Sequence, residues 1–150
     1  MGNLKERQSG ANLRWLIRRD MDRVMEIERR SFFPDQWDEA EFITALRNRN
    51  CIGNVLDPCN IDDDLYGFMI YELHKDRLKI LRMAVHPELR RTGCGAQMIQ
   101  RLKDKLDQQR RYAIDIEVDE RNLACQLFLR AMGFKATGMS RYGIDFMYSV

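Results

Sequence analysis

The sequence predicts an α+β fold in which a mixed, mostly antiparallel central sheet is flanked by about four helices. Short turn sequences separate the strand-like segments in the middle of the chain, and this favours antiparallel neighbours. Two helical patterns precede these segments, and two more alternate with strands after them. Because one of the later helices joins two strands as a crossover, those two strands should lie parallel.

The first half of the chain predicts two helices and a three-stranded meander. A strand begins at Leu13, and Asp20 can cap a helix that runs to about Ser31. Pro34 separates this helix from a second one, which Asp38 caps. The expected strands then lie at 51–56, 65–74 and 78–85, with a tight turn at 75–76.

The second half predicts a crossover followed by a terminal hairpin. Apolar residues from Ala96 to Leu106 recur at helical spacing, after a loop that contains Gly93 and Gly95. The remaining elements are a strand at 112–118, a helix from Asn122 that Gly133 ends, and a hairpin of 134–141 with 144–148. Both tryptophans, Trp15 and Trp37, are expected to pack against other residues.

Composition and charge exclude several classes of function. The chain has 150 residues, 45% of them hydrophobic and 32% charged, which is ordinary for one globular domain. A formal net charge of +2 is too small to indicate nucleic acid as a direct partner. No apolar run is long enough for a membrane helix, and the first residues have no signal-peptide core. We therefore expect a cytoplasmic protein with a flexible tail at 1–12, a single domain at 13–150 and no membrane partner.

The cysteines and histidines do not indicate a metal site. The four cysteines lie far apart and form no CxxC pair, and the two histidines lie in different segments from most of them. We therefore expect no metal cofactor and mostly buried, reduced thiols.

A strand end, a glycine loop and a helix start follow one another at 85–96. Backbone N–H groups at a helix start lack partners, and the helix dipole favours an anion there. Gly93 and Gly95 allow the backbone to approach a pyrophosphate closely, and Arg90 and Arg91 add positive charge. The pattern is neither a Walker A loop nor a complete GxGxxG fingerprint. Glycine spacing alone therefore leaves two alternatives, an anion site or an ordinary strand-to-helix turn.

The residue pattern Arg-x-x-Gly-x-Gly at 90–95, after an Ala-Val-His-Pro strand end at 84–87, resembles the acetyl-CoA loop of the GCN5-related N-acetyltransferases, the GNAT family. The segments at 17–20 and 27–32 resemble the opening of that fold. The segment at 117–122, with Gly133-Phe134 following eleven residues after Asn122, resembles its second half. The most similar subgroup is the RimI-like family, which acetylates the N-terminal alanine of a ribosomal protein.

The resemblance covers about residues 13 to 150 and implies the GNAT fold and an acetyl-CoA-dependent N-acetyltransferase. It implies direct acetyl transfer to a protein N-terminal α-amine, with a protein or peptide partner that could be ribosomal. Separately, we expect a monomer or a weak dimer. Within the family, the strand before the loop pairs with the pantetheine arm and the loop amides bind the pyrophosphate. The implied cofactor-binding residues are Met83, Ala84, Val85, Arg91, Thr92, Gly93, Cys94, Gly95, Ala96 and Asn122.

Glu117 matches the family's general base. A peptide α-amine arrives largely as the ammonium ion and must lose a proton before it attacks. Asp115 should share a strand face with Glu117, and like charges disfavour each other's ionisation, which suits a base working near neutrality. An exposed carboxylate at a strand end, without a catalytic role, is the alternative.

Two departures from the family pattern concern the acid and the acceptor. Leu129 stands where RimI-like proteins have a tyrosine that protonates the departing thiolate. Water could take over this role, Tyr142 in the terminal hairpin could reach the site as the acid, or the enzyme could be slow. The terminal hairpin is also several residues shorter than in the family, where it helps to hold the peptide. Two alternatives therefore stay open: a small-molecule amine as acceptor, and a CoA-binding module with weak catalysis.

Overall fold

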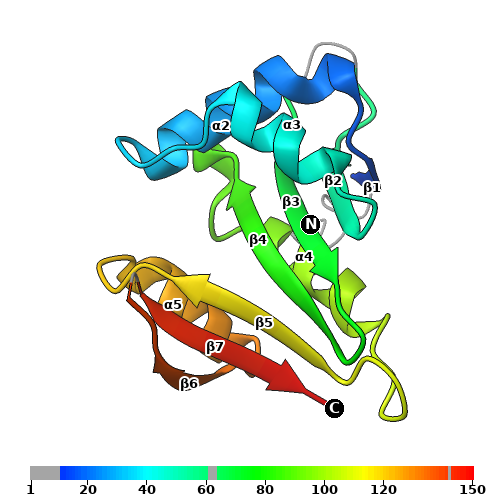
Figure 1. Ribbon diagram of the computed structural model, residues 1–150. Helices are drawn as coiled ribbons and strands as arrows, with labels where there is room; N and C mark the ends of the chain where they lie inside the picture. The colour runs from blue at the N-terminus through cyan, green and yellow to red at the C-terminus, as the bar shows by residue number, and fades with distance from the viewer. Residues whose placement is uncertain (1–10, 61–63, 142) are drawn as a thin grey trace, which may run out of the picture.

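The computed structural model describes residues 11–60, 64–141 and 143–150, and in these it shows one seven-stranded sheet with four α-helices (Figure 1). The strands are β1 (Asn12–Trp15), β2 (Cys51–Asp57), β3 (Gly67–Leu73), β4 (Arg77–Val85), β5 (Ala113–Val118), β6 (Lys135–Met139) and β7 (Ile144–Ser149). The helices are α2 (Met21–Phe32), α3 (Glu39–Arg47), α4 (Cys94–Lys103) and α5 (Leu123–Ala131), with 3₁₀ turns η1 (Arg18–Asp20) and η2 (Pro87–Leu89).

The strands lie in the order β1-β2-β3-β4-β5-β7-β6. Strands β2, β3 and β4 form the antiparallel meander, and β4 pairs with β5 in parallel across the α4 crossover. The predicted α+β class, with a mixed and mostly antiparallel sheet, is therefore confirmed. Within the described residues, no helix has both the length and the apolar character that a membrane span needs.

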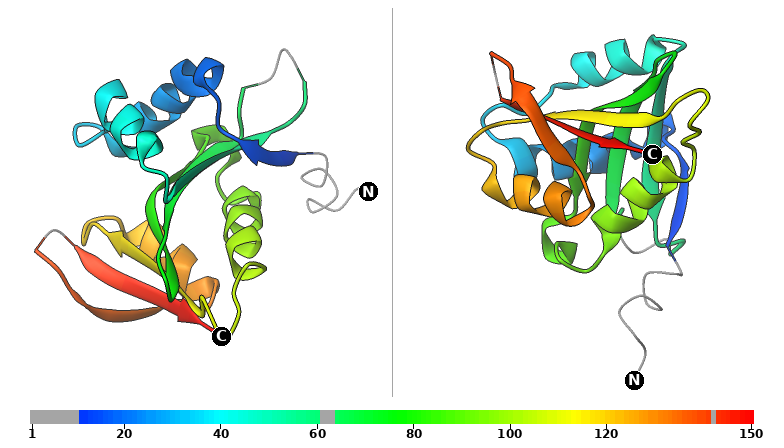
Figure 2. Two further views of the ribbon diagram at one scale, coloured as in Figure 1. Left: turned by 45° about the vertical axis from the view of Figure 1, so that its right-hand side comes forward. Right: turned by 90° about the horizontal axis from the view of Figure 1, so that it is seen from below.

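Two hydrophobic cores lie on opposite faces of the sheet, and Figure 2 shows the helices that cover each face. Helices α2 and α3 cover one face, where Val24 and Phe42 pack on Phe68 of β3. Helices α4 and α5 cover the other, where Met98 and Leu129 belong to the second core. Because side chains alternate along a strand, each strand residue belongs to the α2/α3 face or to the α4/α5 face.

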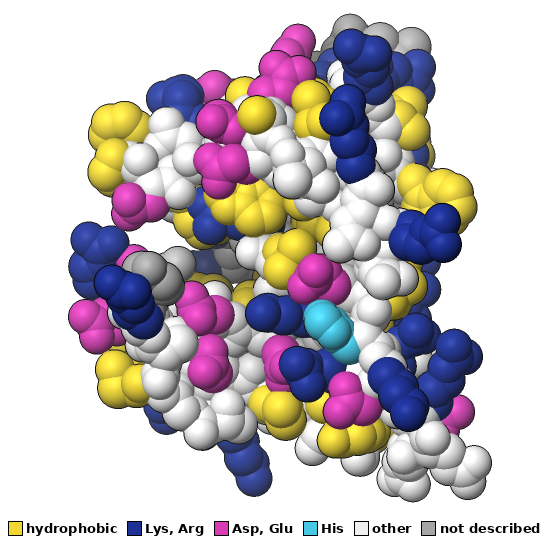
Figure 3. Space-filling model, in the orientation of Figure 1, with side chains coloured by type: hydrophobic (Ala, Val, Ile, Leu, Met, Phe, Trp, Pro, Cys, Tyr) yellow, Lys and Arg dark blue, Asp and Glu magenta, His cyan; other side chains and the backbone are white. Residues whose placement is uncertain are grey.

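Strands β4 and β5 pair at one end and then diverge. They pair over four residues, and the last pair is Ile80 opposite Ile116. The next residue, Leu81, has no partner on β3, so it forms a β-bulge, and a bulge bends its strand. Beyond this point β4 leaves β5 (Figure 1), and the space-filling surface is hollowed between the α2–α3 connection and the end of β5 (Figure 3). The bulge therefore opens a gap between these two strands.

The expectations for the start of α4 and for Trp15 need correction. Helix α4 begins at Cys94, two residues before the predicted start, so Gly95 lies inside the helix. A Cβ on Gly95 would lie 3.0 Å from Phe128, so this glycine lets α4 approach α5 closely. Trp37 packs edge-on against Phe42, but Trp15 is 78% exposed because β1 is an edge strand with a neighbour on one side only.

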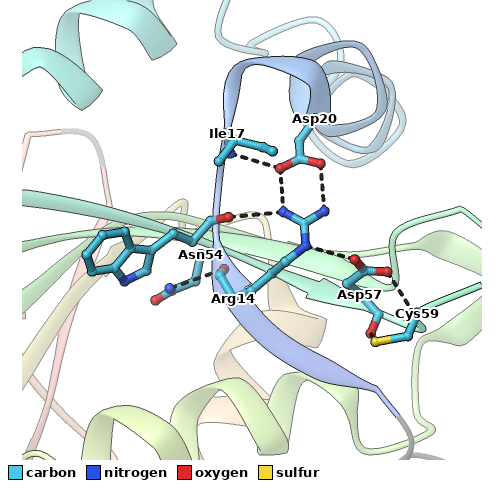
Figure 4. Close-up of polar contacts among 7 residues, drawn as sticks. Arg14, Ile17, Asp20, Asn54, Asp57 and Cys59 are labelled. Atoms are coloured by element: carbon cyan, nitrogen blue, oxygen red, sulfur yellow. Dashed lines mark hydrogen bonds and ion pairs between the residues drawn. The ribbon is translucent and has the colours of Figure 1, made fainter.

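An ionic network connects β1 and the residue before α2 to the end of β2 (Figure 4). Both terminal nitrogens of Arg14 donate to Asp20 at 2.8 Å, and its Nε donates to Asp57 at 2.8 Å. Asp20 also accepts a hydrogen bond from the Ile17 amide. The prediction that the Asp20 side chain caps α2 is wrong, because its carboxylate is taken up by Arg14 and Ile17 instead.

This network should make stability depend on acid pH. Burial opposes the ionisation of Asp20, but the hydrogen bonds from Arg14 and Ile17 outweigh it and lower its pKa. A lowered pKa contributes stability that is complete above about pH 4 and is lost as the pH falls through the folded-state pKa. Asp20→Asn should therefore cost about 2 kcal/mol at neutral pH and progressively less below about pH 4. Urea denaturation of both proteins across this range measures the difference in the free energy of unfolding. A difference that does not depend on pH would contradict the prediction.

Candidate active site

The loop between η2 and α4 has the geometry of an anion site. Arg91 and Gly93 have positive φ angles of 65° and 91°, and such turns make successive N–H groups converge. The first backbone hydrogen bond of α4 runs from the Gln97 amide to the Gly93 oxygen at 2.9 Å. The amides of Cys94, Gly95 and Ala96 therefore have no acceptor inside the helix, and together with the helix dipole they favour an anion.

Side chains hold this loop in place. The Thr92 hydroxyl donates to the Leu89 carbonyl, and Arg90 Nη2 donates to Ser31 Oγ of α2 at 2.9 Å. Cys94 is 1% exposed, and burial raises the pKa of its thiol although Thr92 opposes this. Cys94 can therefore offer its amide to a ligand, whereas its thiol belongs to the core.

The end of β4 offers an unpaired strand edge. Met83, Ala84 and Val85 lie beyond the last pair with β5, and none of them has a partner on β5 in the described part of the chain. Met83 and Val85 pack toward the α4/α5 core, whereas Ala84 belongs to the α2/α3 core. The backbone groups of Met83 and Val85 therefore point away from β3 and into the gap, and an extended ligand can pair with such an edge.

Glu117 lies across the gap on the opposite face of the sheet from the anion loop. Its neighbours Ile116 and Val118 are buried in the α4/α5 core, so its own exposed side chain points to the α2/α3 face. Ser140 Oγ donates a hydrogen bond to Glu117 Oε2 at 2.6 Å. Asp115 lies on the same face, as predicted, but it forms an ion pair with Arg77 at 2.6 Å. Burial raises the pKa of Asp115 against the effect of this arginine.

The sequence singles out three more positions, namely Asn122, Leu129 and Tyr142. Asn122 Oδ1 accepts a hydrogen bond from the Cys125 amide at 3.2 Å, so it caps α5 as predicted. Leu129 is fully buried in the α4/α5 core and presents no polar group to the gap. Tyr142, the predicted acid, lies outside the described residues.

Sequence reasoning missed a buried ion pair beside the gap. Glu28 has no exposed side chain, and its Oε1 lies 2.5 Å from Arg82 Nε. The Trp37 amide donates to the same oxygen, and Arg82 Nη2 donates to the Asp35 carbonyl at 3.0 Å. The guanidinium also lies 4.0 Å from the centre of the Phe32 ring. This pair therefore anchors the α2–α3 connection to β4 next to the bulge.

Two further surface hollows contain none of the loop or gap residues. The larger, of about 730 Å³, lies at the other end of β4 between the turn at Lys75–Asp76 and the segment Gln109–Arg111. The smaller, of about 190 Å³, lies beside α2 and His86. Within the described structure, only the gap brings together unpaired strand edges, the convergent amides and Glu117. We therefore take the gap as the candidate active site.

Comparisons with known proteins agree with this geometry. A model of the acetyltransferase (GNAT) family matches residues 21–134. A search of curated proteins gave no match. Among solved structures, the ribosomal-protein-S18-alanine N-acetyltransferase from Escherichia coli is 19% identical, with a TM-score of 0.75 over 93% of this chain and 94% of that one. Ard1 from Thermoplasma volcanium is 18% identical, with a TM-score of 0.77 over 94% and 98%.

A third similar structure contains a bound ligand. The PaiA N-acetyltransferase from Thermoplasma acidophilum, in complex with coenzyme A, is 15% identical, with a TM-score of 0.75 over 93% of this chain and 99% of that one. At identities below 20%, these three structures show that the fold is shared.

Proposed function

Because the chain belongs to the acetyltransferase (GNAT) family, we propose that it transfers the acetyl group of acetyl-CoA to the α-amine of a protein N-terminus. The observation that carries this proposal is the gap between β4 and β5. Convergent amides approach it from the α4/α5 face, and the Glu117 carboxylate lies at it on the α2/α3 face. An anionic donor and an amine acceptor could thus meet from opposite faces of the sheet.

The residues around the gap fit acetyl-CoA as the donor. The amides of Arg91 to Ala96 would bind the pyrophosphate, and the free edge of Met83, Ala84 and Val85 would pair with the pantetheine arm. Asn122 would add a hydrogen bond while it caps α5. Coenzyme A in the similar PaiA structure supports this donor. Bound acetyl-CoA supplies an activated acetyl thioester.

Glu117 would act as the general base. The acceptor ammonium gives a proton to the carboxylate, and the free amine then forms a C–N bond with the acetyl carbon. The C–S bond breaks, coenzyme A leaves as a thiolate, and the nitrogen of the new amide loses its second proton to water. A thiol pKa of about 8.5 makes that thiolate a tolerable leaving group, so water can protonate it, which fits a buried Leu129 that cannot donate a proton.

An alanine N-terminus, as in the RimI-like family, is the acceptor we propose to test first, since one similar structure is a ribosomal-protein-alanine N-acetyltransferase. Purified protein should be incubated with acetyl-CoA and a peptide that begins with alanine, and the acetylated peptide detected by mass spectrometry. This readout is preferable to a thiol reagent, because Cys59 is an exposed free thiol. If the protein acetylates small amines but no peptide, the acceptor is a small-molecule amine and not a protein N-terminus. Coenzyme A binding without any turnover would indicate a binding module.

Gly93→Ala is expected to weaken the binding of coenzyme A about 10- to 100-fold, because a strained left-handed residue costs about 1–3 kcal/mol. Gly93 has a φ of 91°, and its conformation aims the loop amides. Gly138→Ala on β6 is the matched control, because a Cβ there meets nothing within 4 Å. Calorimetric titration with coenzyme A compares the two variants. Equal affinity of the Gly93 variant and the parent would argue against the loop as the pyrophosphate site.

A further inference from the structure

We infer that Ser140 is a positioning residue for the base of the proposed acetyl transfer, because its hydroxyl holds the Glu117 carboxylate in place. This inference rests on the proposed function. The hydrogen bond from Ser140 Oγ to Glu117 Oε2 is 2.6 Å long, in the range of hydrogen bonds to ionised acceptors. Ser140 Oγ also lies 3.2 Å from the Gly143 carbonyl. A serine has one hydroxyl proton, and the shorter contact with the charged oxygen takes it.

The backbone fixes Ser140 independently of its side chain. The Ser140 amide donates to the Gly143 carbonyl at 2.9 Å, which closes the end of the β6–β7 hairpin. A Cβ on Gly143 would come within 2.3 Å of the Val118 carbonyl oxygen, so this end of the hairpin lies directly against the end of β5. The hairpin therefore delivers the hydroxyl to the residue next to Val118, which is Glu117.

Glu117 needs such a partner because a like charge lies opposite it. Strands β5 and β7 pair in antiparallel register, with Glu117 opposite Asp145. Directly opposed residues share a face, and like charges in these positions repel each other. The Ser140 hydroxyl counteracts this repulsion by engaging Oε2. The other carboxylate oxygen, Oε1, is then left to accept the proton of the acceptor amine.

The test compares variants at Ser140 with matched controls, using acetyl-CoA and an alanine peptide. Ser140→Ala is expected to lower kcat about tenfold with little change in the peptide KM, because the carboxylate is no longer held in place. Ser140→Thr keeps the hydroxyl and should recover most of the rate. Ser140→Cys is nearly isosteric but a weak donor, so it should behave like the alanine variant. Thr137→Ala removes a hydroxyl from the same hairpin and should match the parent.

A double variant separates positioning from a general effect on the fold. Glu117→Gln combined with Ser140→Ala should be no slower than Glu117→Gln alone, because Ser140 acts through the carboxylate. Parental values of kcat in both Ser140→Ala and Ser140→Cys would overturn the inference. So would a loss in the double variant equal to the product of the two single losses.

A measurement without acceptor keeps this inference distinct from the proposed function. The carboxyl ¹³C signal of Glu117 at pH 7 should change its chemical shift in Ser140→Ala but not in Thr137→Ala, because only the first variant loses the hydrogen bond to Oε2. If this difference is present and no amine is acetylated, the proposed function fails and the Ser140–Glu117 contact stands. If amines are acetylated and the Glu117 signal is the same in Ser140→Ala and in the parent, the inference about Ser140 fails alone.

Discussion

Glu117→Gln is expected to lower kcat for the alanine peptide about 10²- to 10⁴-fold, the usual contribution of a general base. Glutamine keeps the shape of the side chain and an oxygen that can accept the Ser140 hydrogen bond, but it cannot take a proton. The exposed position of Glu117 leaves folding nearly unaffected by the change. Steady-state rates of acetylated-peptide formation measure the effect.

The pH dependence makes this result specific to proton removal. An α-amine has a pKa of about 8, so above that pH it arrives without its extra proton and needs the base less. The difference in kcat between the parent and Glu117→Gln should therefore become smaller as the pH rises above about 8. Glu120→Gln provides the matched control, since Glu120 is an exposed carboxylate three positions away and should leave the rate unchanged. A Glu117→Gln variant as active as the parent at pH 7 would remove Glu117 from the mechanism.

Local sequence patterns were sufficient to predict most elements of the fold. Asp38 caps α3 by accepting a hydrogen bond from the Glu41 amide, and Gly133 ends α5 with a φ of 90°, as the spacing of these residues predicted. The parallel pairing of β4 with β5 follows from the crossover rule. Asp20 shows the limit of such reasoning, because Arg14 competes for a carboxylate that the local pattern assigns to α2.

The parts of the candidate site that depend on long-range contacts could not be predicted. Nothing in the strand-like run at 78–85 marks Leu81 as a bulge, because the bulge exists only in the register with β3. Ser140 and Glu117 lie 23 positions apart and meet only when the hairpin lies against β5. Glu28 and Arg82 are 54 positions apart, and only the packing of α2 on β4 brings these charges together.

Arg82→Met is expected to lower the free energy of unfolding by about 3–5 kcal/mol, because it leaves a buried carboxylate without its counter-charge. Glu28 has no exposed side chain, and its Oε2 has no hydrogen-bond partner in the described structure. Glu28→Gln should lower the free energy of unfolding less than Arg82→Met does. In that variant the Arg82 side chain, which is partly exposed to solvent, still contacts Phe32. The double variant should be more stable than Arg82→Met alone, since it removes the unpaired charge.

Acid should partly rescue Arg82→Met. Burial raises the pKa of Glu28, while the Trp37 amide and Arg82 oppose this effect. Without Arg82 the pKa should rise further, and a raised carboxyl pKa contributes stability at low pH that is lost as the pH rises through the folded-state value. The loss in the free energy of unfolding caused by Arg82→Met should thus be smaller near pH 5 than near pH 7. These two values lie roughly within the range where a buried carboxyl titrates. Urea denaturation at both pH values decides this, and a deficit that grows toward acid would show that Glu28 is not the charge left unpaired.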